Sequence, residues 1–342
     1  MKQTILVSVL VLAVLVTGCA SQYKTVAQTQ VTTTRTKAGE QTQTEEVPFI
    51  SFQEVIEHSP NVKSVTRMTD LKGDREPGYF AISPATGDLI FQALEKSSDD
   101  LLINLWSLPT TGSTAMTRLT AGHYYDIEPA LSRDGSTVCF SSNRSSQSPK
   151  LFTVRATGAG GITRLTQSEA EDRAPSLPGR GELVYYMSKP FNSEQWQVWR
   201  VNANGALPTQ LKEGARPRVS PDGERVLFCA EDRKTGKQKI WMMNEDGTGE
   251  TQLTADTESS ELDPAWSPDG SQIVYASDIG KDSNGKRNFD IWMMNADGSA
   301  KTQLTTNGST DLMPAFSPDG EYIYFLSNRG FHWDIWRMEI AE

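Results

Sequence analysis

The sequence contains few of the residues that most enzymes and metalloproteins rely on. Its 342 residues include three cysteines and three histidines. Three cysteines are too few for a disulfide framework, and His58, His123 and His332 fall in different parts of the predicted fold. The motifs His-Glu-x-x-His and Gly-x-Ser-x-Gly are absent, so neither a zinc peptidase nor a nucleophile elbow is indicated. We therefore predict no catalytic residues, no metal site and no cofactor.

A basic surface and a long hydrophobic run are also missing. The net charge of -10 argues against nucleic-acid binding, which requires a basic face. The same charge is compatible with a cationic ligand or a basic partner, and it also simply favours solubility. The longest apolar run, Ile5 to Val16, has about 12 residues and is too short to cross a bilayer.

That apolar run has the length of a signal-peptide core and follows the positive charge of Lys2. It leads into Val16-Thr17-Gly18-Cys19, which resembles the bacterial lipobox. The resemblance implies a signal peptide over residues 1–18 and lipid attachment at Cys19, which would anchor the chain in a membrane. The alternative is an ordinary secretory signal with an incidental cysteine. Ala20 follows in place of aspartate, which favours the outer membrane, so we expect a lipid-anchored envelope protein facing the periplasm.

The segment after the signal is rich in threonine and glutamine. Residues 19–47 contain little apolar side chain to bury, so we predict a disordered tether. Residues 48–61 form a predicted lead-in with a short helix from Phe49 to Ser59, because Ser51 and Glu54 have the spacing of a capping box. Pro60 would end this helix.

One motif recurs through the rest of the chain. Its clearest copy is the Ser-Pro-Asp-Gly turn at residues 267–270, which lies between two short runs of β-branched and aromatic residues. Proline presets φ, serine and aspartate bond the local backbone, and glycine relieves strain, so each copy predicts a strand, a tight turn and a strand. The turn glycines lie 42 to 50 residues apart, at Gly87, Gly135, Gly181, Gly223, Gly270 and Gly320. This period is typical of propeller blades.

Each repeat supplies four strands. The third strand carries an apolar–aromatic pair, and a more polar strand such as Thr117–Thr120 follows it. The pairs are Leu105-Trp106, Leu151-Phe152, Val198-Trp199, Ile240-Trp241, Ile291-Trp292 and Ile335-Trp336. Second strands such as Ile273–Ala276 are apolar on both faces, which requires a neighbouring sheet on each side. A ring of blades provides those neighbours.

The last repeat has no fourth strand after its third. The missing piece stands before the first repeat, where Ser64–Thr69 matches Thr117–Thr120. We therefore predict an all-β fold, a six-bladed β-propeller over residues 62–342 closed by an N-terminal strand and preceded by the disordered tether. Such closure leaves no open sheet edge between the chain ends.

The repeats resemble the TolB-type propeller. The resemblance rests on Asp-x-x-Pro-Ala followed by an apolar residue and Ser-Pro-Asp-Gly, on the Ser-Asn-Arg runs 142–144 and 327–329, and on the Gln-Leu-Thr strands. Such blades occur in Tol-Pal components, in polysaccharide lyases and as accessory domains of peptidases. TolB has an α/β domain before its propeller, whereas a lipobox and a tether stand there in this chain, which favours a TolB-like lipoprotein. The resemblance implies a peptidoglycan-associated lipoprotein as a candidate partner.

The candidate binding residues are acidic and precede or begin the first strand of each repeat. They are Glu76, Asp126, Glu128, Asp172, Glu261, Asp263 and Asp311. We expect them to surround one mouth of the central channel, where a ring of like charge would attract cations or basic segments. The alternative is that each carboxylate only caps its own turn before the proline. The fourth repeat interrupts the series with Arg216 and Arg218.

Most of the aromatic residues and the two cysteines of the repeats are predicted to have structural roles. Tryptophans in the third strands are expected to pack between blades rather than to stack sugars. The aromatic residues most free to meet a ligand are Trp196, Trp333, Tyr124 and Tyr125. Cys139 and Cys229 fall on second strands of blades that are not neighbours, so we expect buried free thiols.

Two classes of function remain open. The first is a monomeric, membrane-anchored scaffold without catalytic activity that binds a protein or peptide in the cell envelope. The alternative is an envelope carbohydrate-active protein, either a glycan binder or a lyase.

Overall fold

A computed structural model describes residues 24–36, 39–51, 59–71, 75–96, 101–111, 115–177, 183–280, 285, 287–330 and 332–341. The predicted signal peptide and Cys19 lie outside these residues. The described elements are all strands, and none of the described segments forms a helix long and apolar enough to cross a membrane. The chain divides into two units, residues 1–56 and 57–342.

The first unit contains a two-stranded antiparallel hairpin. Strand β1 (Lys24–Thr36) pairs with β2 (Gly39–Ser51). This pairing within the expected disordered tether follows from the β-propensity of its threonines and valines. An isolated hairpin is at best marginally stable in water, in keeping with the low apolar content on which the tether prediction rested. Most of the predicted lead-in helix lies outside the described residues, and Phe49 to Ser51 pair in β2.

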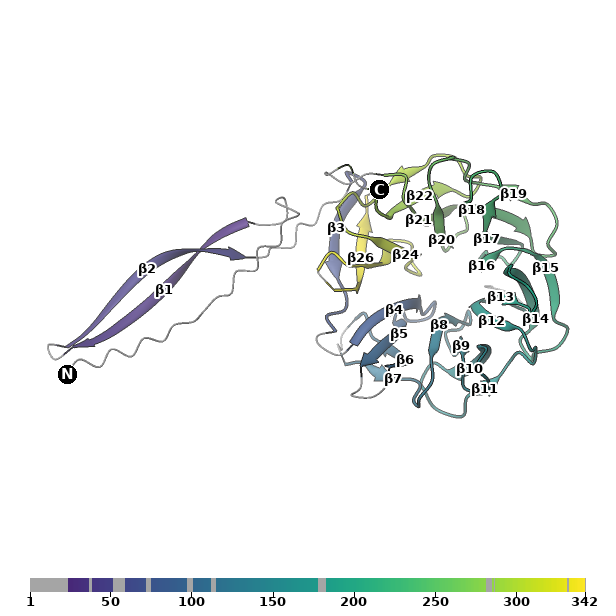
Figure 1. The fold of residues 1–342 in the computed structure, drawn as a ribbon, viewed down its shortest axis with the longest axis horizontal. Helices are drawn as coiled ribbons and strands as arrows, with labels where there is room; N and C mark the ends of the chain where they lie inside the picture. Colours follow the sequence, from purple (N-terminus) through teal and green to yellow (C-terminus); the bar gives the residue numbers. More distant parts are fainter. Residues whose placement is uncertain are drawn as a thin grey trace. The chain divides into compact units, whose positions relative to one another are not determined.

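The second unit is a ring of six four-stranded antiparallel sheets (Figure 1). Blade 1 contains β4 (Arg75–Ile82), β5 (Leu89–Lys96), β6 (Leu101–Leu108) and β7 (Thr117–Arg118). Blade 2 contains β8 (Asp126–Leu131), β9 (Thr137–Ser142), β10 (Lys150–Arg155) and β11 (Thr163–Arg164). Blade 3 contains β12 (Glu171–Ser176), β13 (Leu183–Lys189), β14 (Gln197–Asn202) and β15 (Thr209–Glu213). The first strand of each blade lies nearest the centre of the ring.

The remaining blades include the closure. Blade 4 contains β16 (Ala215–Val219), β17 (Arg225–Asp232), β18 (Lys237–Asn244) and β19 (Thr251–Gln252). Blade 5 contains β20 (Glu261–Trp266), β21 (Gln272–Ser277), β22 (Asp290–Asn295) and β23 (Thr302–Gln303). Blade 6 contains β24 (Asp311–Phe316), β25 (Tyr322–Ser327), β26 (Asp334–Ile340) and β3 (Val62–Arg67). Val65 pairs with Met338, which confirms the predicted closure by an amino-terminal strand.

The repeated turn has the expected chemistry. In blade 5 the Ser267 hydroxyl donates to Asp269 at 2.5 Å and accepts from the backbone N–H of Gln272 at 2.9 Å. Gly270 has φ of +71°, a value that favours glycine. These bonds satisfy the turn locally, so the motif is a structural hairpin connector.

The core is divided among the interfaces between blades. Six hydrophobic clusters each combine side chains from two neighbouring blades. One of them joins Leu227 and Ile240 of blade 4 to Trp266 and Tyr275 of blade 5. Trp336 of blade 6 is 1% exposed and packs with Ile291 of blade 5. This packing supports a structural role for the third-strand tryptophans.

Every inner strand carries a bulge at mid-length, where two of its residues stand opposite one residue of the second strand. In five blades a non-glycine residue before the inner-strand proline has positive φ. These residues are Glu128, Ala174, Arg216, Asp263 and Met313. A left-handed conformation costs a non-glycine residue about 1–2 kcal/mol. The backbone is therefore strained at the same position in five of the inner strands. The bulge also sets which side chains face the channel.

Candidate functional site

Four of the predicted acidic residues begin inner strands and are buried. Asp126 and Asp311 are 0% exposed. The guanidinium of Arg144 contacts Asp126 at 2.6 Å, and that of Arg329 contacts Asp311 at 2.8 Å. Each arginine follows the second strand of the same blade, so the ion pair ties the start of the first strand to the end of the second.

The Ser-Asn-Arg run accounts for this arrangement. The Ser142 hydroxyl donates to Asp126 at 2.6 Å, and the Asn143 side-chain oxygen accepts from the backbone N–H of Tyr125 at 2.8 Å. In blade 6 the equivalent Asn328 accepts from the backbone N–H of Thr310 at 2.9 Å. All three residues of the run therefore bind the loop that enters the blade, which is a structural use of the motif.

Asp172 and Glu261 occupy the equivalent positions at the start of their inner strands, where other residues bind them. Asp172 accepts from Ser168 at 2.5 Å and from Ser188 at 2.7 Å. Glu261 pairs with Lys239 at 2.8 Å, and both side chains are at least 96% buried. The buried carboxylates therefore serve internal bonds.

Glu128 and Asp263 sit at bulges and join neighbouring blades. Glu128 of blade 2 pairs with Arg173 of blade 3 at 3.1 Å and accepts from the backbone N–H of Ala174 at 3.0 Å. Asp263 of blade 5 pairs with Arg216 of blade 4. Both carboxylates are less than a tenth exposed. These two predicted site residues thus reach the channel wall with their charges compensated.

Glu76 differs from the other candidates. It is half-buried and pairs in the sheet with Leu94, at the position where Asp126 pairs with Ser142. Blade 1 therefore lacks the serine that binds Asp126, Asp172 and Glu261 in their blades. The structure places the predicted acidic residues around the inner strands, six of them engaged in the internal bonds given above.

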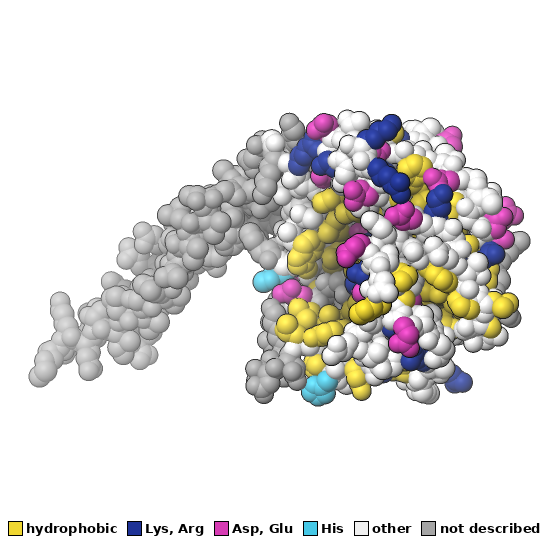
Figure 2. Space-filling model, turned by 45° about the vertical axis from the view of Figure 1, so that its right-hand side comes forward, with side chains coloured by type: hydrophobic (Ala, Val, Ile, Leu, Met, Phe, Trp, Pro, Cys, Tyr) yellow, Lys and Arg dark blue, Asp and Glu magenta, His cyan; other side chains and the backbone are white. Residues whose placement is uncertain are grey.

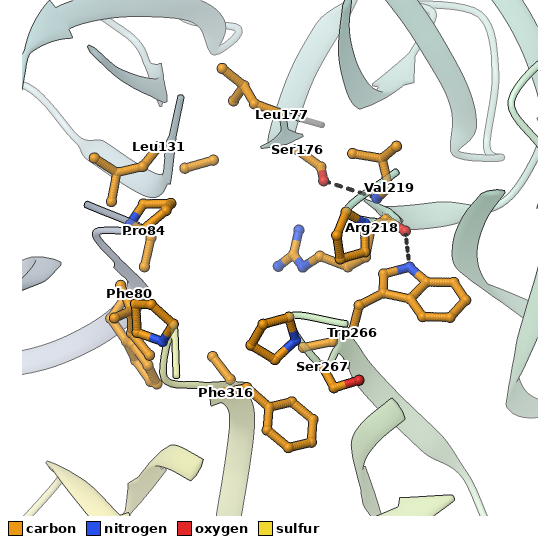
Figure 3. A pocket seen from close by; sticks show the side chains of 18 of the residues that line it. Phe80, Pro84, Leu131, Ser176, Leu177, Arg218, Val219, Trp266, Ser267 and Phe316 are labelled. Atoms are coloured by element: carbon orange, nitrogen blue, oxygen red, sulfur yellow. Dashed lines mark hydrogen bonds between the residues drawn. The ribbon is translucent and has the colours of Figure 1, made fainter. Parts of the chain in front are cut away.

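A cavity of about 720 Å³ occupies the other end of the channel. It runs from the middle of the inner strands to the turns that follow them, and all six blades line it (Figure 3). Its wall includes the proline rings Pro84, Pro129, Pro175, Pro221, Pro268, Pro314 and Pro318. Phe80, Leu131, Leu177 and Phe316 add apolar surface. Figure 2 shows hydrophobic side chains along the edges of a hollow in the molecular surface.

Tyr79 and Asp263 are among the residues that line the cavity, and Arg216 contacts both of them. The Arg216 guanidinium lies 4.9 Å from the centre of the Tyr79 ring, within cation–π distance. Burial, with a further contribution from Asp263, raises the pKa of Tyr79 to about 12. The phenol therefore remains neutral at physiological pH.

Arg218 differs from the residues at the same position in other blades. The residue directly after each bulge lines the cavity, and four of these are small, namely Ala130, Ser176, Ala265 and Ala315. In blade 4 this residue is Arg218, whose guanidinium projects into the space left by the small residues (Figure 3). Burial lowers the pKa of Arg218, but an arginine retains its charge in proteins.

The remaining candidates lie away from this cavity. Tyr124 and Tyr125 are exposed, Arg144 stacks on the Tyr124 ring at 5.0 Å, and Lys189 lies 4.9 Å from the centre of the Trp196 ring. Trp333 packs at the edge of the cluster between blades 6 and 1. These aromatic residues do not line the cavity.

The described histidines and thiols do not form a metal centre. His123 and His332 are exposed, and His58 lies outside the described residues. Across the described part of the chain, no group of three or more His, Cys, Asp or Glu side chains could hold a metal ion. Cys139 and Cys229 are buried free thiols, as predicted, and burial raises the pKa of each to about 12.

Comparison with known proteins identifies the fold. A protein assigned as TolB from Agrobacterium tumefaciens superposes with a TM-score of 0.59 at 16% identity, over 81% of this chain and 97% of that chain. The chain has a TolB-like propeller fold. An oligogalacturonate lyase from Vibrio parahaemolyticus has a TM-score of 0.57 at 16% identity, over 85% of this chain and 96% of that chain. A gluconolactonase from Xanthomonas campestris has a TM-score of 0.56 at 10% identity, over 81% and 89%.

Sequence comparison adds no closer relative. No family model matches the chain, and no curated protein matches it in sequence. The TolB-like propeller therefore has structural neighbours named both as TolB and as enzymes, and its function must be argued from its own residues.

The cavity residues were missed by the sequence reasoning. The relevant signal is Arg216-Pro217-Arg218, which departs from the Asp-x-x-Pro-Ala pattern of blades 2 and 6. It was interpreted as a gap in an acidic ring. In the structure, Arg216 compensates a carboxylate and Arg218 projects into the cavity.

Proposed function

We propose that the chain is an envelope lipoprotein, anchored through acyl groups on Cys19, whose propeller is a non-catalytic scaffold for a protein or peptide partner. The cavity of about 720 Å³ is the observation that carries the proposal. Its described lining combines prolines, aliphatic side chains and aromatic rings with two arginines, three aspartates and three serines, and it has no histidine, cysteine, lysine or glutamate. Cavities of this size that combine apolar walls with placed polar groups are typical binding sites.

Site-specific photo-crosslinking in the native envelope tests the scaffold. A photoreactive residue would replace Asp222 or Pro318, exposed residues on turns at the cavity rim, and in a control it would replace exposed Thr163 on the outer strand β11. We expect crosslinks to a discrete partner from the rim positions and none from Thr163. A peptidoglycan-associated lipoprotein is the first partner to test for. Equal crosslinking from rim and control positions would count against a partner bound at the cavity.

Lipid attachment requires its own test. Metabolic labelling with a fatty-acid analogue should label the wild-type chain, and Cys19→Ser should abolish the label and release the protein from membranes. Label retained in Cys19→Ser would refute anchoring at this residue.

A carbohydrate-active role is the second candidate. It is favoured by the fold shared with oligogalacturonate lyase, a likeness of fold at 16% identity. An assay of polygalacturonate cleavage, with and without divalent cations, distinguishes the two functions. Turnover that a chelator abolishes would replace the scaffold proposal.

A further inference from the structure

The position directly after the inner-strand bulge determines what the cavity can bind. Four small residues at this position open the space, and Arg218 projects into it. We propose that Arg218 binds a carboxylate, either a side chain or the carboxyl terminus, of an apolar peptide segment inserted into the cavity. This assignment rests on the scaffold function proposed above and names the chemistry of its ligand.

The charge of Arg218 is not compensated by an acidic neighbour. Arg173 pairs with Glu128 and Arg216 pairs with Asp263. Among the described residues, Arg218 has no such ion pair, and its Nη1 donates only to the carbonyl of Pro217 at 3.1 Å. A guanidinium has five N–H donors in a planar fork that matches a carboxylate. Arg218 therefore retains donors for an incoming anion.

The backbone around Arg218 is fixed from both sides. The Val219 N–H donates to the Ser176 hydroxyl of blade 3 at 3.1 Å, and the Trp266 indole N–H donates to the Arg218 carbonyl at 3.0 Å (Figure 3). Blades 3 and 5 thus both hold the residue that carries the guanidinium. A binding group fixed in this way loses little freedom when its ligand arrives.

Asp263 is an acidic residue near Arg218, but it does not neutralise the Arg218 charge. The charge of Asp263 acts on Arg218, but Asp263 forms its ion pair with Arg216. Arg216, Arg218 and Asp263 together carry one net positive charge, whereas Arg133, Asp222 and Asp269 are the other charged residues of the lining. The local positive charge next to Arg218 favours an anion at this point of the cavity.

The cavity wall favours a peptide over a glycan. A sugar presents many hydroxyl groups that need polar partners when buried. The Ser267 and Ser317 hydroxyls already donate to turn aspartates at 2.5 Å, and the Ser176 hydroxyl, which accepts from Val219, keeps only its own proton to donate. Proline and aliphatic surface suits apolar side chains, and Arg218 suits one carboxylate among them.

Binding of short peptides tests the assignment directly. The probes are N-acetyl-Ala-Leu-Phe with a free carboxyl terminus, the same peptide as its amide, and trigalacturonate. We expect the free acid to bind with a dissociation constant at least about tenfold below that of the amide, the difference that loss of a charged hydrogen bond produces. Calorimetry on the folded full chain measures the affinities.

Three variants locate the effect. Arg218→Gln should weaken binding of the free-acid peptide by about tenfold or more and leave binding of the amide peptide unchanged. Arg218→Lys should recover part of the affinity for the free acid. Arg155→Gln, which removes an exposed arginine from β10, is the matched control and should bind like wild type. Urea unfolding verifies that each variant is folded, and the acid–amide comparison on the wild-type protein decides the matter if Arg218→Gln is not.

Several results would overturn the assignment. They are no detectable binding of the acid, equal affinity for acid and amide, unchanged acid binding by folded Arg218→Gln, and tighter binding of trigalacturonate than of the acid. The last of these would favour the carbohydrate alternative. If rim crosslinking captures a protein partner but the acid and amide peptides bind equally, the carboxylate assignment of Arg218 is wrong and the scaffold proposal is kept. If the acid peptide binds as expected but no partner is captured, the scaffold proposal is wrong and the carboxylate assignment of Arg218 is kept.

Discussion

The Arg216 guanidinium and the Tyr79 ring lie 4.9 Å apart, although they come from blades 4 and 1 on opposite sides of the ring. Their contact therefore crosses the central channel. Arg216 also pairs with Asp263 of blade 5, so three blades meet at this point. The inner strands thereby gain a link that does not follow the order of the blades.

Removing this link should destabilise the propeller. Tyr79→Ala removes a half-buried ring and its cation–π contact, and we expect it to lower the free energy of unfolding by about 3 kcal/mol. Tyr79→Phe keeps the ring and should cost less than about 1 kcal/mol. Urea unfolding followed by tryptophan fluorescence measures both. Equal losses would show that the hydroxyl, rather than the ring, makes the important contact.

The buried pair of Asp311 and Arg329 should be far more sensitive than an exposed pair. Asp311→Ala leaves the guanidinium of Arg329, which is 3% exposed, without its counter-charge. We expect a loss of about 3–5 kcal/mol in the free energy of unfolding. Glu213→Ala is the control, because its partner Arg233 is 84% exposed, and it should cost under about 1 kcal/mol. Similar losses for the two variants would contradict the structural role given to Asp311.

Asp290 should make stability fall as pH rises. Burial, with the nearby charge of Asp311, raises the pKa of Asp290 to about 8 in the folded protein. In the unfolded chain its pKa is about 3.9. Between these values the folded protein keeps a proton that the unfolded chain has lost. The free energy of unfolding therefore drops by up to about 1.4 kcal/mol per pH unit as pH rises through this range, and levels off above it.

The variant Asp290→Asn isolates this effect. It cannot ionise, so its stability curve between pH 5 and pH 8 should be flatter than that of the wild type. Asp297→Asn, on an exposed turn of the same blade, should keep the wild-type slope. Thermal or urea unfolding at several pH values provides the comparison, and identical slopes for wild type and Asp290→Asn would refute the raised pKa.

The closing strand should contribute to the stability of the whole ring. Val65 is 6% exposed and belongs to the cluster between blades 5 and 6. Val65→Ala should lower the free energy of unfolding by about 1–3 kcal/mol. Its neighbour Thr66 is exposed, so Thr66→Ala should change stability by less than about 0.5 kcal/mol. Deletion of residues 59–70 should lower the unfolding midpoint further, and an unchanged midpoint would show that the ring does not need this strand.

The fold was predictable because its signals are local. Turn chemistry at Ser267 to Gly270, the repeat period and the match of Ser64–Thr69 to a fourth strand each depend on residues close in sequence. The hairpin of β1 and β2 was not predicted, since its composition indicates disorder and its pairing adds no large apolar core.

The site was less predictable because it depends on contacts between blades. Glu128 and Asp263 lie on inner strands, but their partners Arg173 and Arg216 are 45 and 47 residues away in the sequence. No local pattern reveals such a pair. The role of Arg218 likewise depends on the ring, which places small residues from four other blades around it at the positions directly after their bulges.

The closure of blade 6 determines the order in which the ring can be completed. Strand β3 is the first strand of the propeller to leave the ribosome, and its partner β26 is the last, after ~270 further residues. At 5–20 residues per second this gap lasts on the order of 15–55 s. Val62 and Val65 have no neighbours to pack against until blade 5 is made, and the backbone of β3 is an unpaired edge until β26 follows. A nascent chain of this architecture therefore carries an aggregation-prone strand until its final residues arrive.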